Sequence, residues 1–381
     1  MIIDCIRYKK GEYKVLFCLL FYLVIFENFR LAQNVSLADV IYPFFAIYFF
    51  LKSPFSKDNK NSSYILLIAL GFGVIAFLDF LFFNSMNMLL SQFRFIYNCT
   101  IFVVIARYFL QNENYEVPQL IDSYIYICVL CSMFIILQFL SFYLFHFNLA
   151  FDFGAYQGAI NHASLEIPSF GSLYRTGGFF KEPSWFAVFM GPSLEIAYQR
   201  KYNKQLIICI LGLIFSTSSM GFLFIFAFAF INLKNQRKYL FAFLLSICII
   251  YIIFPMAFSR LFDALTFDPH ADNSNNARVI SPFLLFAHIK QIPVLGMDIN
   301  LLYLQDKNLF LNTFLFVFAS FGIIGLILFL KILLQPSRLL SIILLFTIII
   351  EGCYGRMDFW MPLLVSVVYS SSPNYLKLRN F

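Results

Sequence analysis

The feature that most constrains this chain is a series of apolar runs, each close to the length needed to cross a lipid bilayer. A hydrocarbon core of about 30 Å requires about 20 apolar residues in a helix. Such runs lie at 13–29, 36–51, 63–83, 92–110, 120–147, 183–199, 238–258 and 309–331, and shorter ones at 205–217, 219–233, 338–350 and 358–370. Backbone polar groups in lipid must be bonded within the protein, so these runs are predicted to be helices. We therefore predict an all-α polytopic membrane protein, a single membrane domain over residues 1–381 with about twelve transmembrane helices.

Composition agrees with this class. The chain is 61% hydrophobic and 12% charged, whereas soluble domains are about half apolar and about a quarter charged. The net charge of +7 comes from cations spread over short connections, so a nucleic-acid partner is not expected. No small-residue cleavage site follows the first apolar run, and we expect that run to remain as the first span.

The cations also predict an orientation. With twelve helices, the cations on one side include Lys9, Lys14, Lys52, Lys57, Arg200, Lys201, Lys204, Lys234, Arg237, Lys331, Arg338, Lys377 and Arg379. By the positive-inside rule that side is the cytoplasm, which puts both termini there. Two long polar loops, about 148–182 and about 259–308, then lie outside. Loops of this length are usually functional or disordered, and we expect these two to be ordered, with short helices on the membrane surface.

The segment from Gln205 to Leu233 carries cations at both ends but is short for two full spans. Because the charge pattern requires two crossings, we predict two short or tilted helices that meet at Ser216-Thr217-Ser218-Ser219. The hydroxyl groups there can donate to carbonyls of the preceding turn and so satisfy a broken helix end.

Cysteine usage predicts neither a metal site nor disulfides. Cys128 and Cys131 form a C-x-x-C pair, but it lies inside a predicted span and no second pair accompanies it. We interpret these cysteines as packing residues.

The stretch from Tyr174 to Ala187 is the strongest candidate site. It places Arg175, Gly177, Gly178 and Lys181 directly before a helix that begins at Pro183, a residue suited to a first turn. The free amides of that turn, the two glycines, the arginine fork and the lysine charge could together hold a phosphate. A simpler interpretation is that the two cations only extend to the membrane interface.

Other polar residues are weaker candidates. All four histidines lie in or at the edge of the two long loops, and His162 and His270 are the two that could act as a base. An interfacial histidine can equally be structural. Among charges within the spans, Asp79 and Arg94 flank the same short outside loop and are candidates for a pair, either functional or a structural ion pair.

Several motifs, taken in order, resemble the O-antigen polymerase and O-antigen ligase family, the Wzy-type polymerases of bacterial surface polysaccharides. The first loop ends in Arg175-Thr-Gly-Gly-Phe-Phe-Lys-Glu182-Pro183-Ser184, which is similar to that family's Arg-x-x-Gly-x-Phe-x-acid-Pro stretch. Ser216–Gly221 resembles a serine-rich turn of the family, with Met220 where an Arg often stands. Asn276-Ala277-Arg278, together with Gly296 further on, resembles the arginine of the family's second long loop and the glycine segment that follows it.

A further motif separates the two activities of the family. Leu311-Asn312 followed by Gly322-Ile-Ile-Gly325 resembles the His-Asn and Gly-x-x-Gly of the ligases, but Leu311 replaces the histidine on which ligases rely. The resemblance covers about 174–330 and favours a polymerase.

The resemblance implies an enzyme of the bacterial inner membrane that joins undecaprenyl-diphosphate-linked oligosaccharides at its periplasmic face. No cofactor is implied. Arg175 and Arg278 would hold the diphosphate with help from Lys181, Gly177 and Gly178, while Glu182 is the favoured base and His162 and His270 compete with it. Alternatively, Glu182 only caps its helix. Besides membrane lipid and the lipid-linked substrate, a chain-length regulator protein could be a partner.

Two other functions remain open. A ligase of the same family would transfer finished glycan to lipid A core or to a protein, and the missing histidine counts against it. A polysaccharide transporter or lipid flippase would be expected to show an inverted repeat and charges at the bilayer midplane, and neither is evident in the sequence.

Overall fold

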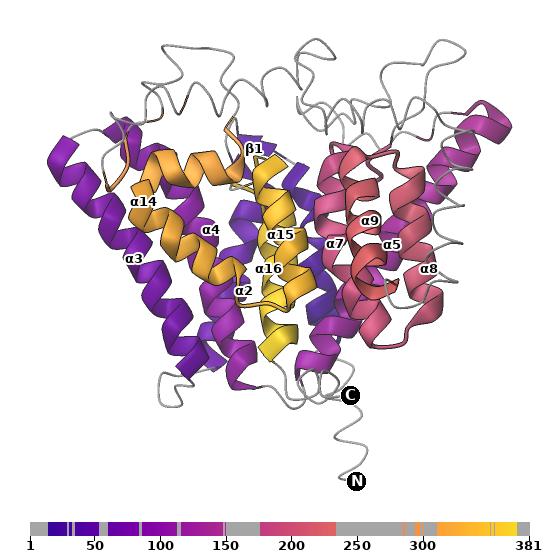
Figure 1. Cartoon of the computed structure of the whole chain (residues 1–381), viewed down its shortest axis with the longest axis horizontal. Helices are drawn as coiled ribbons and strands as arrows, with labels where there is room; N and C mark the ends of the chain where they lie inside the picture. The colour runs from indigo at the N-terminus through magenta and orange to yellow at the C-terminus, as the bar shows by residue number, and fades with distance from the viewer. Residues whose placement is uncertain are drawn as a thin grey trace, which may run out of the picture.

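The computed structural model of the chain describes residues 14–28, 30–32, 35–52, 60–83, 86–112, 116–147, 149, 176–233, 285, 294–297, 299, 311–350, 352–353 and 355–371. These residues are mostly helical (Figure 1). The first apolar run is α-helical at 14–22 and continues into a 3-10 helix, η1 (Ile25–Asn28). Two short antiparallel strands follow, β1 (Arg30–Ala32) and β2 (Val35–Ser36).

The remaining helices follow the apolar runs of the sequence. They are α2 (Leu37–Lys52), α3 (Lys60–Phe83), α4 (Met86–Gln111), α5 (Glu116–Phe145), α7 (Pro183–Gln199), α8 (Asn203–Phe215), α9 (Ser219–Leu233), α14 (Thr313–Leu333), α15 (Arg338–Ile350) and α16 (Met357–Ser371).

Four of the described helices are long and apolar enough to cross a membrane. Their candidate spans are Ser63–Phe82, Gln92–Gln111, Glu116–Phe145 and Thr313–Leu333. Shorter apolar helices run over Asn203–Phe215, Ser219–Asn232 and Leu340–Ile349. The chain is thus a helical protein of membrane type, whereas the count of twelve spans stays a prediction. The predicted span at 238–258 and most of the two long loops lie outside the described residues.

The helices form a bundle in which some neighbours in sequence pack together, such as α3 with α4 and α7 with α8, and in which distant helices also pair, such as α5 with α8 and α16 with α4 and α7 (Figure 1). The described connections lie at two ends of the bundle. One end, which we call the upper end after Figure 1, carries η1, the two strands and the residues that lead into α7 and α16. The opposite end of the bundle carries four cations that lie near helix ends or in connections: Lys52, Lys201, Lys204 and Lys331.

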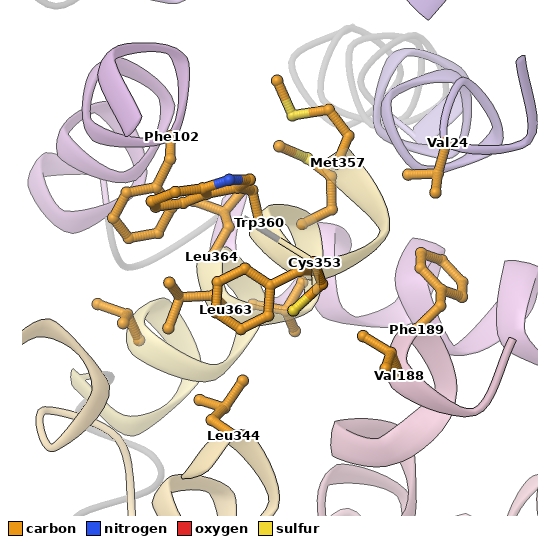
Figure 2. Close-up of a cluster of buried hydrophobic side chains, with 14 of the residues drawn as sticks. Val24, Phe102, Val188, Phe189, Leu344, Cys353, Met357, Trp360, Leu363 and Leu364 are labelled. Atoms are coloured by element: carbon orange, nitrogen blue, oxygen red, sulfur yellow. The ribbon is translucent and has the colours of Figure 1, made fainter. Parts of the chain in front are cut away.

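α16 is the central helix of the bundle. Every residue from Met357 to Tyr369 is buried, as expected for a helix that is covered on all sides. Trp360 packs edge-on against Phe95 with ring centroids 5.4 Å apart, and against Phe102 at 5.5 Å. Figure 2 shows Phe102 on one side of α16, with Val24 and Phe189 on the other. The start of α16 is therefore fixed against several elements at the upper end.

The structure confirms the two short helices predicted to meet at the serine-rich turn, Ser216–Ser219. α8 ends at Phe215, α9 begins at Ser219, and the two helices pack together. The Ser216 hydroxyl donates to the carbonyl of Leu213 at 2.7 Å, which is the back-bond expected from the sequence. Thr217 adopts a left-handed conformation with φ 52° and turns the chain.

α14 is broken at Gly322, and the break joins two of the sequence motifs. Gly322 has φ 62° inside the helix, and a Cβ placed there would lie 2.0 Å from the carbonyl oxygen of Val294. Gly296 has φ 115°, and its Cβ would lie 2.3 Å from the carbonyl oxygen of Ser320. The segment 294–297 thus packs against the backbone of α14 at the break, and the Met297 amide donates to the carbonyl of Ala319 at 2.7 Å.

The side chain of Gln92 also bonds a backbone carbonyl at the break in α14. The Gln92 amide group donates to the carbonyl of Ser320 and, at 2.8 Å, to Asp79 Oδ2. Carbonyls released by the kink are therefore bonded within the protein, as a membrane helix requires. The suggested pairing of Asp79 with Arg94 is wrong: Asp79 bonds Gln92, and Arg94 lies within 4 Å of Glu27 and Asp39 instead.

Candidate functional site

The end of the first loop, Thr176–Glu182, is tied to α5. The Thr176 hydroxyl donates to Gln138 Oε1, and Gln138 in turn donates to the carbonyl of Leu149 at 2.7 Å. The Gly178 amide donates to the Thr176 hydroxyl oxygen at 3.1 Å. Thr176 and Gln138 are both fully buried. Because every link uses a buried polar group, this segment holds a defined position at the upper end of the bundle.

Two glycines shape a tight turn within this segment. The Phe180 amide donates to the carbonyl of Gly177 at 2.9 Å, and a Cβ on Gly177 would lie 2.5 Å from the carbonyl oxygen of Phe180. Gly178 has φ 64°, and its Cβ would lie 2.8 Å from Ile135. Both positions therefore require glycine. Since the Gly178 amide bonds Thr176, that amide supports the turn in this structure.

Glu182 occupies the N-cap position of α7, and Pro183 is the first helical residue, as the sequence predicts. The amides of Trp185 and Phe186 donate to the backbone carbonyl of Glu182 at 3.1 and 3.3 Å. The Glu182 carboxylate makes no capping bond and instead accepts a hydrogen bond from the Ser184 hydroxyl at 3.4 Å. Its side chain is thus held at the start of α7 without being used to cap the helix.

Two cations from distant parts of the chain meet at the Trp185 ring. The Lys181 ammonium lies 6.0 Å from the ring centroid. The guanidinium carbon of Arg356 lies 3.8 Å from the same centroid, within the range of a cation–π contact. Arg356 directly precedes α16, whose N-terminal half packs among buried neighbours. The start of α7 and the start of α16 therefore present Lys181 and Arg356 at one place.

Sequence reasoning missed Arg356. The signal that could have found it is its position between the apolar runs 338–350 and 358–370, which the charge pattern places on the outside. Cations are depleted in outside loops, so a cation that lies there at the start of an apolar helix is a candidate functional residue.

Charged side chains around Arg356 form what we call the rim cluster, made of Glu27, Asp39, Arg94, Arg356 and Asp358. Arg356 Nε lies 3.2 Å from Asp358 Oδ1. Arg94 Nη2 lies 3.4 Å from Asp39 Oδ2 and 3.8 Å from Glu27 Oε1. Both oxygens of Glu27 accept the Met357 amide at 3.0 Å, so a carboxyl group from η1 satisfies a backbone donor at the N-terminus of α16.

Glu27 lies beyond the end of the first α-helix and outside the four candidate membrane helices. The pKa of Glu27 is raised to about 8, chiefly by burial and also by the nearby carboxylates of Asp358 and Asp39, while the guanidinium groups of Arg94 and Arg356 act to lower it. Glu27 therefore holds its proton to a higher pH than an ordinary glutamate does.

The structure brings part of the predicted site together. Gly177, Gly178, Lys181 and Glu182 lie in one short segment beside the start of α16. The predicted diphosphate ligands Arg175 and Arg278 and the alternative bases His162 and His270 all lie outside the described residues. Within the described part of the chain, no group of three His, Cys, Asp or Glu side chains could hold a metal ion.

The described residues place two cations together at the upper end of the bundle. Lys181 and Arg356 provide positive charge, and Glu182 provides a carboxylate one residue from Lys181. Arg356 also lies beside Asp358, so an anionic ligand would share this guanidinium with a carboxylate. Comparisons of the chain with models of protein families, with curated proteins and with solved structures found no match.

Proposed function

We propose that this chain is a membrane glycosyltransferase that lengthens a polysaccharide from undecaprenyl-diphosphate-linked oligosaccharides at the periplasmic face of a bacterial inner membrane. The observation that carries the proposal is the meeting of Lys181 and Arg356 at Trp185. This meeting occurs beside the polymerase-like segment Thr176–Ser184, at one end of a bundle of apolar helices. A lipid-borne diphosphate has its charge at that level of a membrane protein.

The reaction forms one bond, breaks one bond and transfers one proton. The acceptor hydroxyl oxygen forms a bond to the anomeric carbon of the donor sugar, and the bond from that carbon to the diphosphate oxygen breaks. The electron pair of the broken bond stays on the lipid diphosphate, and the hydroxyl proton passes to a base. Cations near the leaving oxygen stabilise the charge that develops, and a carboxylate within reach of the hydroxyl accepts the proton.

The cations that contact the diphosphate are Lys181 and Arg356, and Arg175 and Arg278 from the two long loops complete its neutralisation. Glu182 is the favoured base, because its carboxylate is not committed to capping α7. His162 and His270 remain the alternative bases.

A second observation supports the polymerase assignment. Gly296 and Gly322 belong to two motifs that resemble the polymerase and ligase family, and the structure packs one against the other. Leu311, which replaces the ligase histidine, is buried, while Asn312 caps α14 by accepting the Leu315 amide at 2.8 Å. The position of that histidine therefore holds an apolar packing residue, which favours polymerase over ligase.

The test is reconstitution of the purified protein in proteoliposomes with lipid-linked repeat units and no ion gradient. We expect products of many repeats, with lipid diphosphate released in step with each bond formed. Arg175→Ala and Arg278→Ala should each stop elongation while the protein remains in the membrane. If wild-type protein only moves the lipid between leaflets, it is a transporter, and if it attaches glycan to lipid A core, it is a ligase.

A further inference from the structure

An apolar groove of about 670 Å³ lies against one side of α5. It is bounded by the first helix and η1 on one side, by α8 on the other, and by the end of the first loop. Its lining residues are Tyr22, Ile25, Ile127, Leu130, Cys131, Met133, Phe134, Ile136, Leu137, Leu140, Phe179 and Ile208. Apart from the Tyr22 hydroxyl, these side chains carry no oxygen or nitrogen, so the groove suits a hydrocarbon.

The shape of the groove suits one extended chain. Its lining on α5 runs from Ile127 to Leu140, and over these 14 residues an α-helix rises about 20 Å. Leu130, Met133 and Leu137 are 40%, 54% and 53% exposed, so this lining is open to the outside of the bundle. α5 is a candidate membrane helix, so in a bilayer this open side of the lining would face lipid. A lipid tail could therefore enter sideways.

The groove reaches the candidate site through Phe179. Phe179 lines the groove and stacks on Phe134 with centroids 4.1 Å apart and an interplanar angle of 11°. Lys181 follows two residues later, and its ammonium group lies by Trp185 with Arg356. An apolar tail in the groove would thus have positive charge near its head, where a diphosphate would lie.

We propose that this groove holds the polyprenyl tail of the lipid-diphosphate substrate, with the Phe134–Phe179 stack between the tail and the two cations. The proposal rests on the proposed function and adds to it the face by which the lipid enters. A tail that leaves the bilayer for an apolar groove gains little hydrophobic free energy, because lipid is equally apolar. The groove therefore acts by orienting the tail, so that the diphosphate reaches Lys181 and Arg356.

The first experiment fills the groove. Leu137→Trp places a bulky ring in it, and Leu70→Trp is the matched control, since Leu70 is a 59% exposed leucine of α3 that does not line the groove. Elongation is measured with a long polyprenyl-diphosphate-linked substrate and with an analogue whose tail is a single short prenyl unit. We expect Leu137→Trp to raise KM several-fold for the long-tailed substrate alone. Equal behaviour of the two variants on both substrates would overturn the proposal.

The second experiment uses wild-type protein and requires no turnover. A polyprenyl diphosphate without sugar, carrying a photoreactive group at mid-tail, is added to the protein in vesicles, and cross-linked peptides are identified. We expect labelling within 127–140 and at Ile208, with competition by unlabelled polyprenyl diphosphate. Equal competition by an anionic phospholipid, or labelling only elsewhere, would show that the groove is not the polyprenyl site.

The two experiments separate this inference from the proposed function. Elongation by wild-type protein without labelling of α5 would leave the polymerase assignment standing and reject the groove. Specific labelling of α5 in a protein that elongates nothing would support the groove as a lipid-diphosphate site and reject the polymerase.

Discussion

Arg356 and Trp185 show how one contact between distant residues defines the candidate site. The guanidinium carbon of Arg356 lies over the Trp185 ring, 3.8 Å from its centroid, and a guanidinium group is well suited to stacking on an aromatic face. Asp358 lies 3.2 Å from Arg356 Nε and limits where the side chain can turn. The contact therefore both orients a cation and joins the start of α7 to the start of α16.

This geometry predicts that lysine cannot replace Arg356. Arg356→Lys keeps the charge but loses the planar stack and the fork of donors, so the elongation rate in proteoliposomes should fall by about tenfold or more. Lys331→Ala is the control, since Lys331 is an exposed cation at the opposite end of the bundle and should leave the rate unchanged. Normal elongation by Arg356→Lys would mean that this arginine does not contact the diphosphate.

Lys181 should behave in the opposite way. Its ammonium group lies 6.0 Å from the Trp185 centroid, too far for a close stack, so it acts through its charge. We expect Lys181→Arg to elongate nearly as well as wild type and Lys181→Glu to lose elongation, measured in the same vesicles. A strong defect in Lys181→Arg would show that the size of this side chain matters more than its charge.

Glu27 predicts a dependence of stability on pH. The folded protein holds the Glu27 proton with a pKa of about 8 against an ordinary value of 4.5, so it binds that proton more tightly than the unfolded chain does. The free energy of unfolding should therefore fall as pH rises from about 5 to about 8. In Glu27→Gln this loss should shrink, as followed by thermal unfolding in detergent across that range. Identical pH profiles for the two proteins would contradict the assignment.

At the scale of elements, the break in α14 depends on two glycines that face each other. A helix interrupted in a membrane protein leaves carbonyls without intrahelical donors, and here Met297 and Gln92 supply donors to Ala319 and Ser320. The segment 294–297 can approach only because neither Gly296 nor Gly322 has a side chain.

Alanine at these glycines should therefore destabilise the fold. Gly322→Ala would place Cβ 2.0 Å from the Val294 carbonyl oxygen at a positive φ, and it should cost at least about 1 to 3 kcal/mol of stability. Gly73→Ala is the matched control, because nothing lies within 4 Å of its Cβ and alanine favours a helix. Melting temperatures in detergent give the comparison, and equal values for the two variants would rule out the interlocked break.

At the scale of the whole molecule, buried α16 organises the bundle. It packs against α4, α5 and α7, and its start lies within the rim cluster. The described connections sort to two ends, with the candidate site at one end and Lys52, Lys201, Lys204 and Lys331 at the other. The positive-inside rule then predicts which end faces the cytoplasm.

This orientation can be measured with reporter fusions. A reporter inserted between Lys201 and Tyr202 should be active only if that reporter works in the cytoplasm, whereas one inserted in the predicted loop 148–182 should require export. The opposite result at either site would reverse the bundle and remove the candidate site from the periplasmic face.

The sequence by itself predicted the helices that the structure describes, because long apolar runs and the requirement for internal backbone bonds leave few alternatives. It also located the Ser216–Ser219 turn and the start of α7 at Pro183, since both depend on residues close together in the chain. It could not predict that Arg356 meets Trp185, that Glu27 bonds the Met357 amide, or that Gly296 seats against Gly322. Those contacts join segments far apart in sequence, and only the packing of helices around α16 decides which of the many apolar faces meet.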